Sequence, residues 1–91
     1  MWYLYIIRCR DGSLYTGIAT DVDKRLAVHR AGKGAKYLRG RGPLTLVYQT
    51  RIGAKALALK TERRVKALPK TKKEQLVATQ LSIATLLPDS K

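Results

Sequence analysis

Residues 2–18 carry the strongest structural constraint in this chain. Residues 2–9 read Trp-Tyr-Leu-Tyr-Ile-Ile-Arg-Cys, and apolar or aromatic side chains occupy both of the faces that alternate along a strand. This pattern is typical of a central strand that is covered on two sides. Residues 14–18 form a second strand-like run, and Arg10-Asp11-Gly12-Ser13 between the two runs is a turn signal. The sequence therefore predicts an N-terminal β-hairpin.

The length of the hairpin loop decides where two tyrosines lie. A two-residue turn at Asp11-Gly12 would place Tyr5 and Tyr15 on opposite faces of the hairpin. A three-residue loop over residues 10–12, with Gly12 in the left-handed position of a bulge, shifts the pairing by one residue and places both tyrosines on one face. We predict the three-residue loop.

Capping signals predict the first helix. Thr20-Asp21-Val22-Asp23 resembles a capping box, with the Asp23 carboxylate in the place usually taken by Glu, and Gly32 is a plausible stop signal. We therefore expect residues 21–31 to be helical. Arg25 and His29 then lie one turn apart, at the border of the apolar stripe.

The remaining chain continues with a basic loop that contains four glycines, a third strand and two helices. A short final segment, also predicted to be helical, ends at Pro88. The loop is predicted over residues 32–42, the strand over residues 44–50 and the two helices over residues 54–68 and 71–80. Pro69 ends the first of the two helices, and Thr71 to Glu74 form a second capping box.

This order of elements predicts an α+β fold with a small, largely antiparallel three-stranded sheet flanked by helices, in the order β-β-α-β-α-α. A chain of 91 residues can bury one core, so we expect a single domain over residues 1–91.

The charge of the chain favours a polyanionic partner. The formal net charge is +13, and sixteen of the nineteen Lys and Arg residues lie between Lys24 and Lys73. Such a field attracts DNA or RNA. The same stretch contains one acidic residue, Glu62, three residues before Val65 on the inward side of its helix. An exposed ion pair contributes only about 0–1 kcal/mol, so metal ligation explains this carboxylate better than a salt bridge to a neighbouring cation does.

Several classes of protein are disfavoured because the chain lacks the residues or the long apolar segment that they require. Cys9 is the single cysteine, so no intramolecular disulfide or cysteine metal cluster can form. The apolar start over residues 2–7 stops at Arg8, so it predicts neither a signal peptide nor a membrane span, and we expect a cytoplasmic protein. With His29 as the single histidine and no Walker loop, neither a Ser-His-Asp triad nor a nucleotide cofactor site is expected.

The basic loop over residues 32–42 is a candidate binding segment. A flexible surface connection is the simpler interpretation, but cations spaced along a mobile backbone can follow a phosphate chain. We predict that four residues of this loop contact nucleic acid: Lys33, Lys36, Arg39 and Arg41.

Taken together, these residues resemble the GIY-YIG nuclease family, and the whole length is similar to its small stand-alone YhbQ-like branch. The two strand motifs that name the family read Tyr3-Leu4-Tyr5 and Tyr15-Thr16-Gly17 here. The family pattern continues with an Arg ten residues after the tyrosine of the second motif, which is Tyr15 here. It is completed by a His four residues after that Arg and by a Glu on a later helix. These residues match Arg25, His29 and Glu62.

The resemblance implies an endonuclease that hydrolyses phosphodiester bonds with one metal ion, on DNA more readily than RNA, in repair or processing. We expect Glu62 to hold a single Mg²⁺ or Mn²⁺. Arg25 would contact phosphate oxygens, Tyr5 would act as base and Tyr15 would be a phosphate ligand. His29 would either orient Tyr5 or accept a proton. The sequence does not decide which of the two tyrosines is the base and which is the phosphate ligand.

Two departures from the family pattern favour an alternative. The first motif has Tyr3 where the family has glycine, and the chain contains no Asn, which many of these nucleases use beyond the Glu. The alternative is a catalytically weak or inactive module that binds nucleic acid without cutting it. A third interpretation, a small ribosome-associated or scaffolding protein, would use the charge alone. Oligomeric state and sequence specificity stay open.

Overall fold

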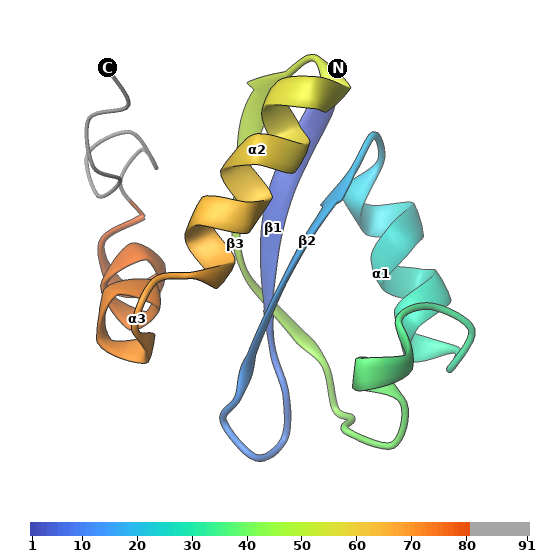
Figure 1. Cartoon of the computed structure of the whole chain (residues 1–91). Coiled ribbons are helices and arrows are strands. Elements are labelled where there is room, and N and C mark those ends of the chain that lie inside the picture. The colour runs from blue at the N-terminus through green and yellow to red at the C-terminus, as the bar shows by residue number, and fades with distance from the viewer. Residues whose placement is uncertain (81–91) are drawn as a thin grey trace.

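The computed structural model describes residues 1–80 and has the predicted α+β architecture (Figure 1). The elements are β1 Trp2–Arg8, β2 Leu14–Ala19, α1 Val22–Arg30, the short 3₁₀ turn η1 Lys36–Leu38, β3 Thr45–Gly53, α2 Lys55–Lys66 and α3 Lys70–Thr79. The predicted order is confirmed, with η1 added inside the loop. The segment predicted to end at Pro88 lies outside the described residues.

The sheet has β1 at its centre, with β2 and β3 paired antiparallel on either side. The two faces of β1 are both buried, as its doubly apolar sequence predicts. Leu4, Ile6 and Ile7 are 0% exposed. Burial of each such side chain contributes roughly 1.5–3 kcal/mol of hydrophobic stabilisation.

Each face of the sheet has its own core. Tyr5 and Ile7 pack toward α1, in a cluster that also contains Leu26 and Leu38. Leu4 and Ile6 pack on the other face, with Val65 of α2 and Leu76 of α3. The edge strand β2 runs between α1 and α2 (Figure 1), so side chains from both helices reach it. Within residues 1–80, no helix has the length and apolar character that a membrane crossing requires.

The first helix has an N-cap one residue later than predicted and not the predicted capping box, because the N3 residue is then Lys24, whose side chain cannot accept the reciprocal hydrogen bond. The N-cap of α1 is Asp21 rather than Thr20, because the Asp21 carboxylate accepts a hydrogen bond of 3.1 Å from the Lys24 backbone N–H. The predicted stop is confirmed. Gly32 adopts φ +77°, and its N–H donates to the His29 carbonyl at 3.0 Å. Such left-handed residues end helices without a Cβ penalty.

The second capping box is wrong. Helix α3 begins at Lys70 after Pro69, so Thr71 lies inside its first turn. The Glu74 carboxylate does not cap the helix, because it accepts two hydrogen bonds of 2.7 and 2.8 Å from the Arg8 guanidinium of β1. The guanidinium offers this carboxylate two charged donors, whereas the predicted capping box would offer it one backbone N–H.

Candidate active site

The hairpin register places Tyr5 and Tyr15 on one face. Tyr15 pairs with Ile7 and Gly17 pairs with Tyr5, as the three-residue loop predicts. Gly12 has φ +86°, and its N–H donates to the Cys9 carbonyl at 2.9 Å. The two tyrosine rings consequently lie with their centroids 6.5 Å apart.

Gly17 makes room for the Tyr5 hydroxyl. A Cβ at residue 17 would lie 2.5 Å from Tyr5 Oη and 2.6 Å from Cζ. No side-chain rotation can relieve that overlap while the ring stays on the strand, because Tyr5 is 2% exposed. The glycine of the second strand motif thus fixes where the phenol oxygen lies.

His29 comes to the same point from α1. Its side chain is 2% exposed, and Nε2 lies 2.8 Å from Tyr5 Oη. The other ring nitrogen, Nδ1, accepts a hydrogen bond of 3.1 Å from the backbone N–H of Ala35. A backbone N–H only donates, so Nδ1 carries no proton and the neutral ring carries its proton on Nε2. We infer from this network that His29 Nε2–H donates to Tyr5 Oη.

The loop after α1 is shaped around the imidazole. Gly34 lies against the ring, and a Cβ there would overlap it. Burial, followed by the positive charge of Arg25, lowers the pKa of His29. Both effects favour the neutral ring, which agrees with the hydrogen bond from Ala35.

Arg25 and Glu62 bring opposite charges to the phenol. Arg25 lies one turn before His29 on the exposed side of α1, near enough to the Tyr5 hydroxyl to affect its pKa. Burial, followed by the neighbouring Tyr15, raises the pKa of Tyr5 to about 12, against the opposing influence of the Arg25 guanidinium. The Glu62 carboxylate on α2 is near enough to raise this pKa further. The structure therefore gathers the five residues that sequence singled out.

Glu62 is the acidic side chain of this group. Its side chain is 18% exposed, and Oε2 lies 3.5 Å from Lys66 Nζ, one turn later on α2. The salt bridge to a neighbouring cation, which we weighed against metal ligation, is thus present. Among residues 1–80 there is no group of three or more His, Cys, Asp or Glu residues that could enclose a metal. One carboxylate still fits Mg²⁺ or Mn²⁺, because such ions keep several waters and take phosphate oxygens as ligands.

The four basic residues of the loop differ in their freedom. Lys33, Lys36 and Arg39 are exposed. Arg41 is engaged within the chain, because Nη1 pairs with Asp11 at 3.1 Å and the guanidinium carbon lies 4.3 Å from the centroid of Tyr37. The loop is therefore partly fixed to the hairpin, in contrast to the flexible connection that its glycines suggested.

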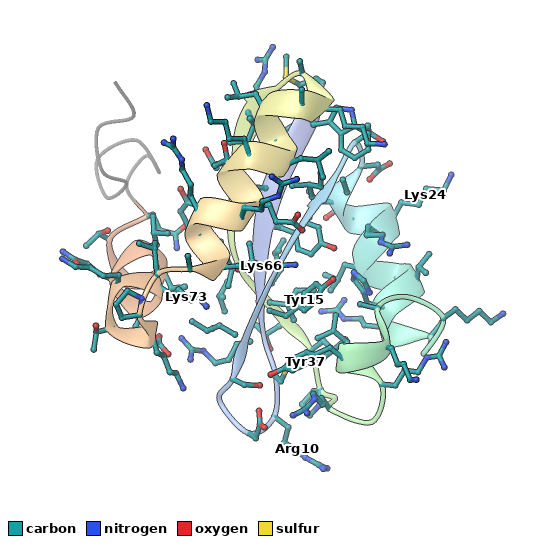
Figure 2. The ribbon with its side chains drawn as sticks, viewed as in Figure 1. Arg10, Tyr15, Lys24, Tyr37, Lys66 and Lys73 are labelled. Atoms are coloured by element: carbon teal, nitrogen blue, oxygen red, sulfur yellow. The ribbon has the colours of Figure 1, made fainter. Side chains whose placement is uncertain are left out.

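Three further residues lie beside the site, and sequence reasoning did not select them. Tyr37 stacks on Tyr15 at a centroid distance of 5.9 Å, and Lys66 Nζ lies 5.9 Å from the Tyr15 ring centroid. Lys73 of α3 lines the same depression as these side chains. Figure 2 shows Lys66, Tyr15 and Tyr37 in succession between the ribbons of α2 and α1. Tyr37 follows Lys36 in the basic loop, but nothing in the sequence of that loop indicated a contact with Tyr15.

The fold is that of a nuclease-family domain. Residues 1–75 match the GIY-YIG catalytic domain, so the chain belongs to the GIY-YIG family.

Its relatives are small bacterial proteins of similar length. The UPF0213 protein YhbQ of Escherichia coli is 55% identical over 86 residues, which cover 94% of this chain and 86% of that protein. A UPF0213 protein of Cronobacter sakazakii is 54% identical over 85 residues, which cover 93% of this chain and 90% of that protein. The predicted YhbQ-like branch is confirmed.

Two solved structures share the fold. The solution NMR structure of the UPF0213 protein BH0048 from Bacillus halodurans has 53% sequence identity and a TM-score of 0.55, covering 86% of this chain and 84% of that chain. The solution NMR structure of the protein EF2693 from E. faecalis has 35% identity and a TM-score of 0.59, covering 86% of this chain and 83% of that chain.

Proposed function

We propose that this chain is a divalent-metal-dependent endonuclease that hydrolyses phosphodiester bonds in DNA, acting in cytoplasmic DNA repair or processing. The observation that supports the activity most is the environment of the Tyr5 hydroxyl. The buried phenol is hydrogen-bonded by His29 at 2.8 Å, and the Arg25 guanidinium and the Glu62 carboxylate lie near enough to affect its pKa. This is a proton-transfer group with a cation and a carboxylate beside it, as phosphodiester hydrolysis requires.

Tyr5 is the proposed general base. Its oxygen accepts a hydrogen bond from His29 and lies near the positive charge of Arg25, and both stabilise a phenolate more than a phenol. A pKa of about 12 nevertheless leaves roughly one phenolate in 10⁵ molecules at pH 7. Positive charge that arrives with the substrate complex must therefore lower this pKa before Tyr5 can take a proton from water.

His29 acts as the orienter of Tyr5 rather than as its proton acceptor. Both ring nitrogens are already used, since Nδ1 accepts from Ala35 and Nε2 carries the proton that it shares with Tyr5. The lowered pKa of His29 also opposes the uptake of a second proton. The sequence left both roles open, and the geometry favours the role of orienter over that of proton acceptor.

Glu62 is the proposed ligand for one Mg²⁺ or Mn²⁺. Bound there, the ion would polarise the scissile phosphate and stabilise the leaving oxygen. Arg25 would donate its planar fork to the phosphate oxygens, and Tyr15 would contact the same phosphate from the neighbouring strand. Lys33, Lys36 and Arg39 would hold the flanking backbone, and Arg41 would take part only by leaving Asp11.

The alternative is a member of the family that binds nucleic acid without cutting it. The absence of Asn and the raised pKa of Tyr5 favour this second function. It predicts that affinity depends on the basic residues and not on Tyr5 or Glu62.

Cleavage of labelled linear, nicked, branched and single-stranded DNA, and of RNA, tests the proposal. We expect cutting with Mg²⁺ or Mn²⁺, none with chelator, and a loss of at least about 100-fold in Glu62→Gln. Asp23→Asn, which removes an exposed carboxylate from the first turn of α1, is the matched control and should cut normally. Tight binding without cutting on every substrate would establish the alternative.

The role of Tyr5 has its own test. Tyr5→Phe keeps the ring over Gly17 and removes the oxygen that His29 contacts. Loss of a general base lowers rates by about 10²–10⁴-fold, so we expect a loss in this range in single-turnover assays. A variant that cuts at the wild-type rate would exclude Tyr5 as the base.

A further inference from the structure

A depression of about 360 Å³ opens beside Tyr15, at the edge of the candidate active site. It brings together side chains from β2, η1, α2 and α3, which are Leu14, Tyr15, Thr16, Tyr37, Lys66 and Lys73. Its volume falls at the small end of the range of about 300–1,000 Å³ that is usual for ligand sites. Nothing in the mechanism above uses Tyr37, Lys66 or Lys73.

The depression has two cations that are available to an anion. Among residues 1–80, Lys73 has no ion-pair partner. Lys66 pairs with Glu62 at 3.5 Å, but its side chain is 52% exposed. Such a pair contributes about 0–1 kcal/mol, so a phosphate can replace Glu62 as the partner of Lys66 at little cost. Two ammonium groups on different helices therefore face one nucleotide-sized space.

The depression also has an aromatic wall, formed by Tyr15 and Tyr37. Tyr37 is 45% exposed, yet it is held in place by its stack on Tyr15 and by the Arg41 guanidinium, which donates to the Tyr37 carbonyl at 2.7 Å. A fixed ring loses little conformational entropy when a ligand packs against it. An aromatic wall offers little to a phosphate group, whereas a nucleobase can stack on it.

We propose that this depression binds an unpaired nucleotide next to the cleaved bond, with its phosphate on Lys66 and Lys73 and its base against Tyr15 and Tyr37. The inference rests on the proposed function, because Tyr15 is the residue that joins the depression to the active site. Its ring lies 5.7 Å from His29 and 5.9 Å from Tyr37, measured between centroids.

The combination of cations and aromatic rings selects an unpaired nucleotide over a base pair. In a continuous duplex, neighbouring base pairs cover both faces of each base, and the outer surface offers phosphate and sugar. A duplex could reach the lysines but could not place a base on the rings. Single strands, flaps, gaps and junctions present a base that can, so the structure assigns these as the preferred substrates.

Binding without cutting tests the depression. Fluorescence anisotropy with chelator compares a labelled single-stranded oligonucleotide with its duplex. We expect Lys73→Gln to weaken single-strand binding and to reduce the slope of log K against log salt by about 0.7, the value for one lost phosphate contact. Lys72→Gln removes the same charge from the next residue, which does not line the depression, and should leave the slope unchanged.

The aromatic wall is tested by Tyr37→Leu and Tyr37→Trp. We expect Tyr37→Leu to weaken single-strand binding at least about fivefold and duplex binding little, and Tyr37→Trp to restore the single-strand affinity. Recovery by Trp separates the contact with a base from damage to the fold. Equal losses on single strand and duplex, or a Lys73→Gln variant that behaves like Lys72→Gln, would overturn the proposal.

Cleavage by the wild-type protein keeps the two proposals separate. If the wild type cuts with Mg²⁺ while the Tyr37 and Lys73 variants bind normally, the depression is not the subsite and the nuclease assignment stands. If the variants lose single-strand affinity as expected while the wild type cuts nothing, the depression is a binding site and the nuclease assignment fails.

Discussion

At the level of single residues, the Tyr5 hydroxyl shows how packing sets chemistry. Its oxygen lies where it does because Gly17 has no side chain, and its partner His29 is held by Gly34 and the Ala35 N–H. The same burial that fixes these groups raises the pKa of Tyr5 and lowers that of His29. The phenol and the imidazole of the candidate site are therefore fixed in place but electrically neutral.

The single histidine makes this arrangement directly measurable. We expect long-range proton–nitrogen NMR spectra to show His29 as the neutral Nε2–H tautomer, titrating below its ordinary value of about 6.5. A ring that carries its proton on Nδ1, or that titrates above that value, would contradict the network.

The same shift makes stability depend on pH. Below about pH 6.5 the unfolded chain binds a proton on His29 that the folded chain does not bind, so the free energy of unfolding falls as the pH falls toward the lowered pKa. His29→Gln should remove this dependence in urea titrations at different pH values.

Sequence could select the five residues that the structure brings together in the candidate site, but not their surroundings. Tyr5, Tyr15, Arg25, His29 and Glu62 stand at spacings that local structure and the family pattern interpret. Three neighbours were missed because their role comes from contacts between segments that are far apart in the chain. These residues are Tyr37, Lys66 and Lys73.

At the level of elements, the hairpin was the most predictable part. Its alternation, its turn signal and Gly12 all indicate one register, and the structure has that register. The helix starts were less predictable. Asp21 and Thr20 are both good caps in adjacent positions, and Glu74 has a stronger partner in Arg8, which no local pattern reveals.

Helix α3 depends on that partner for its place. The Arg8–Glu74 pair joins it to β1, and Lys70 Nζ donates to the Gly12 carbonyl at 3.2 Å. Both side chains of the pair are about a third exposed, so we expect Glu74→Gln to lower the free energy of unfolding by about 1 kcal/mol or less. Chemical denaturation at low salt measures this change.

Acid should remove the same contribution. Hydrogen bonds from Arg8, followed by its charge, lower the pKa of Glu74, so the stabilisation is present above the ordinary carboxylate pKa and is lost as the pH falls through the lowered value. In Glu74→Gln this part of the acid sensitivity should be absent. An identical acid profile in both proteins would mean that the pair contributes nothing.

At the level of the whole molecule, the net charge of +13 acts on any nucleic acid regardless of its sequence. Affinity should therefore fall steeply with salt, and the slope counts the phosphate contacts. The charge is not spread evenly along the chain, because sixteen of the nineteen Lys and Arg residues lie between Lys24 and Lys73.

Neutralising Lys36 and Arg39 together tests the loop. We expect binding to duplex DNA to weaken about tenfold and the salt slope to fall by about 1.8, the value for two contacts. Arg51→Gln with Lys60→Gln removes the same charge from exposed positions outside the loop and should change the slope much less. Equal effects of the two double variants would mean that only the overall field matters.

The close approach of Gly17 to Tyr5 has a consequence for comparing sequences. A motif glycine is usually taken as a sign of an unusual backbone, but Gly17 is an ordinary strand residue whose missing atom marks the position of a hydroxyl on another strand. Positions 5 and 17 should then change together across the family. A relative with alanine at position 17 should therefore lack the tyrosine at position 5. Its second strand motif alone would then show that the proposed general base has been lost.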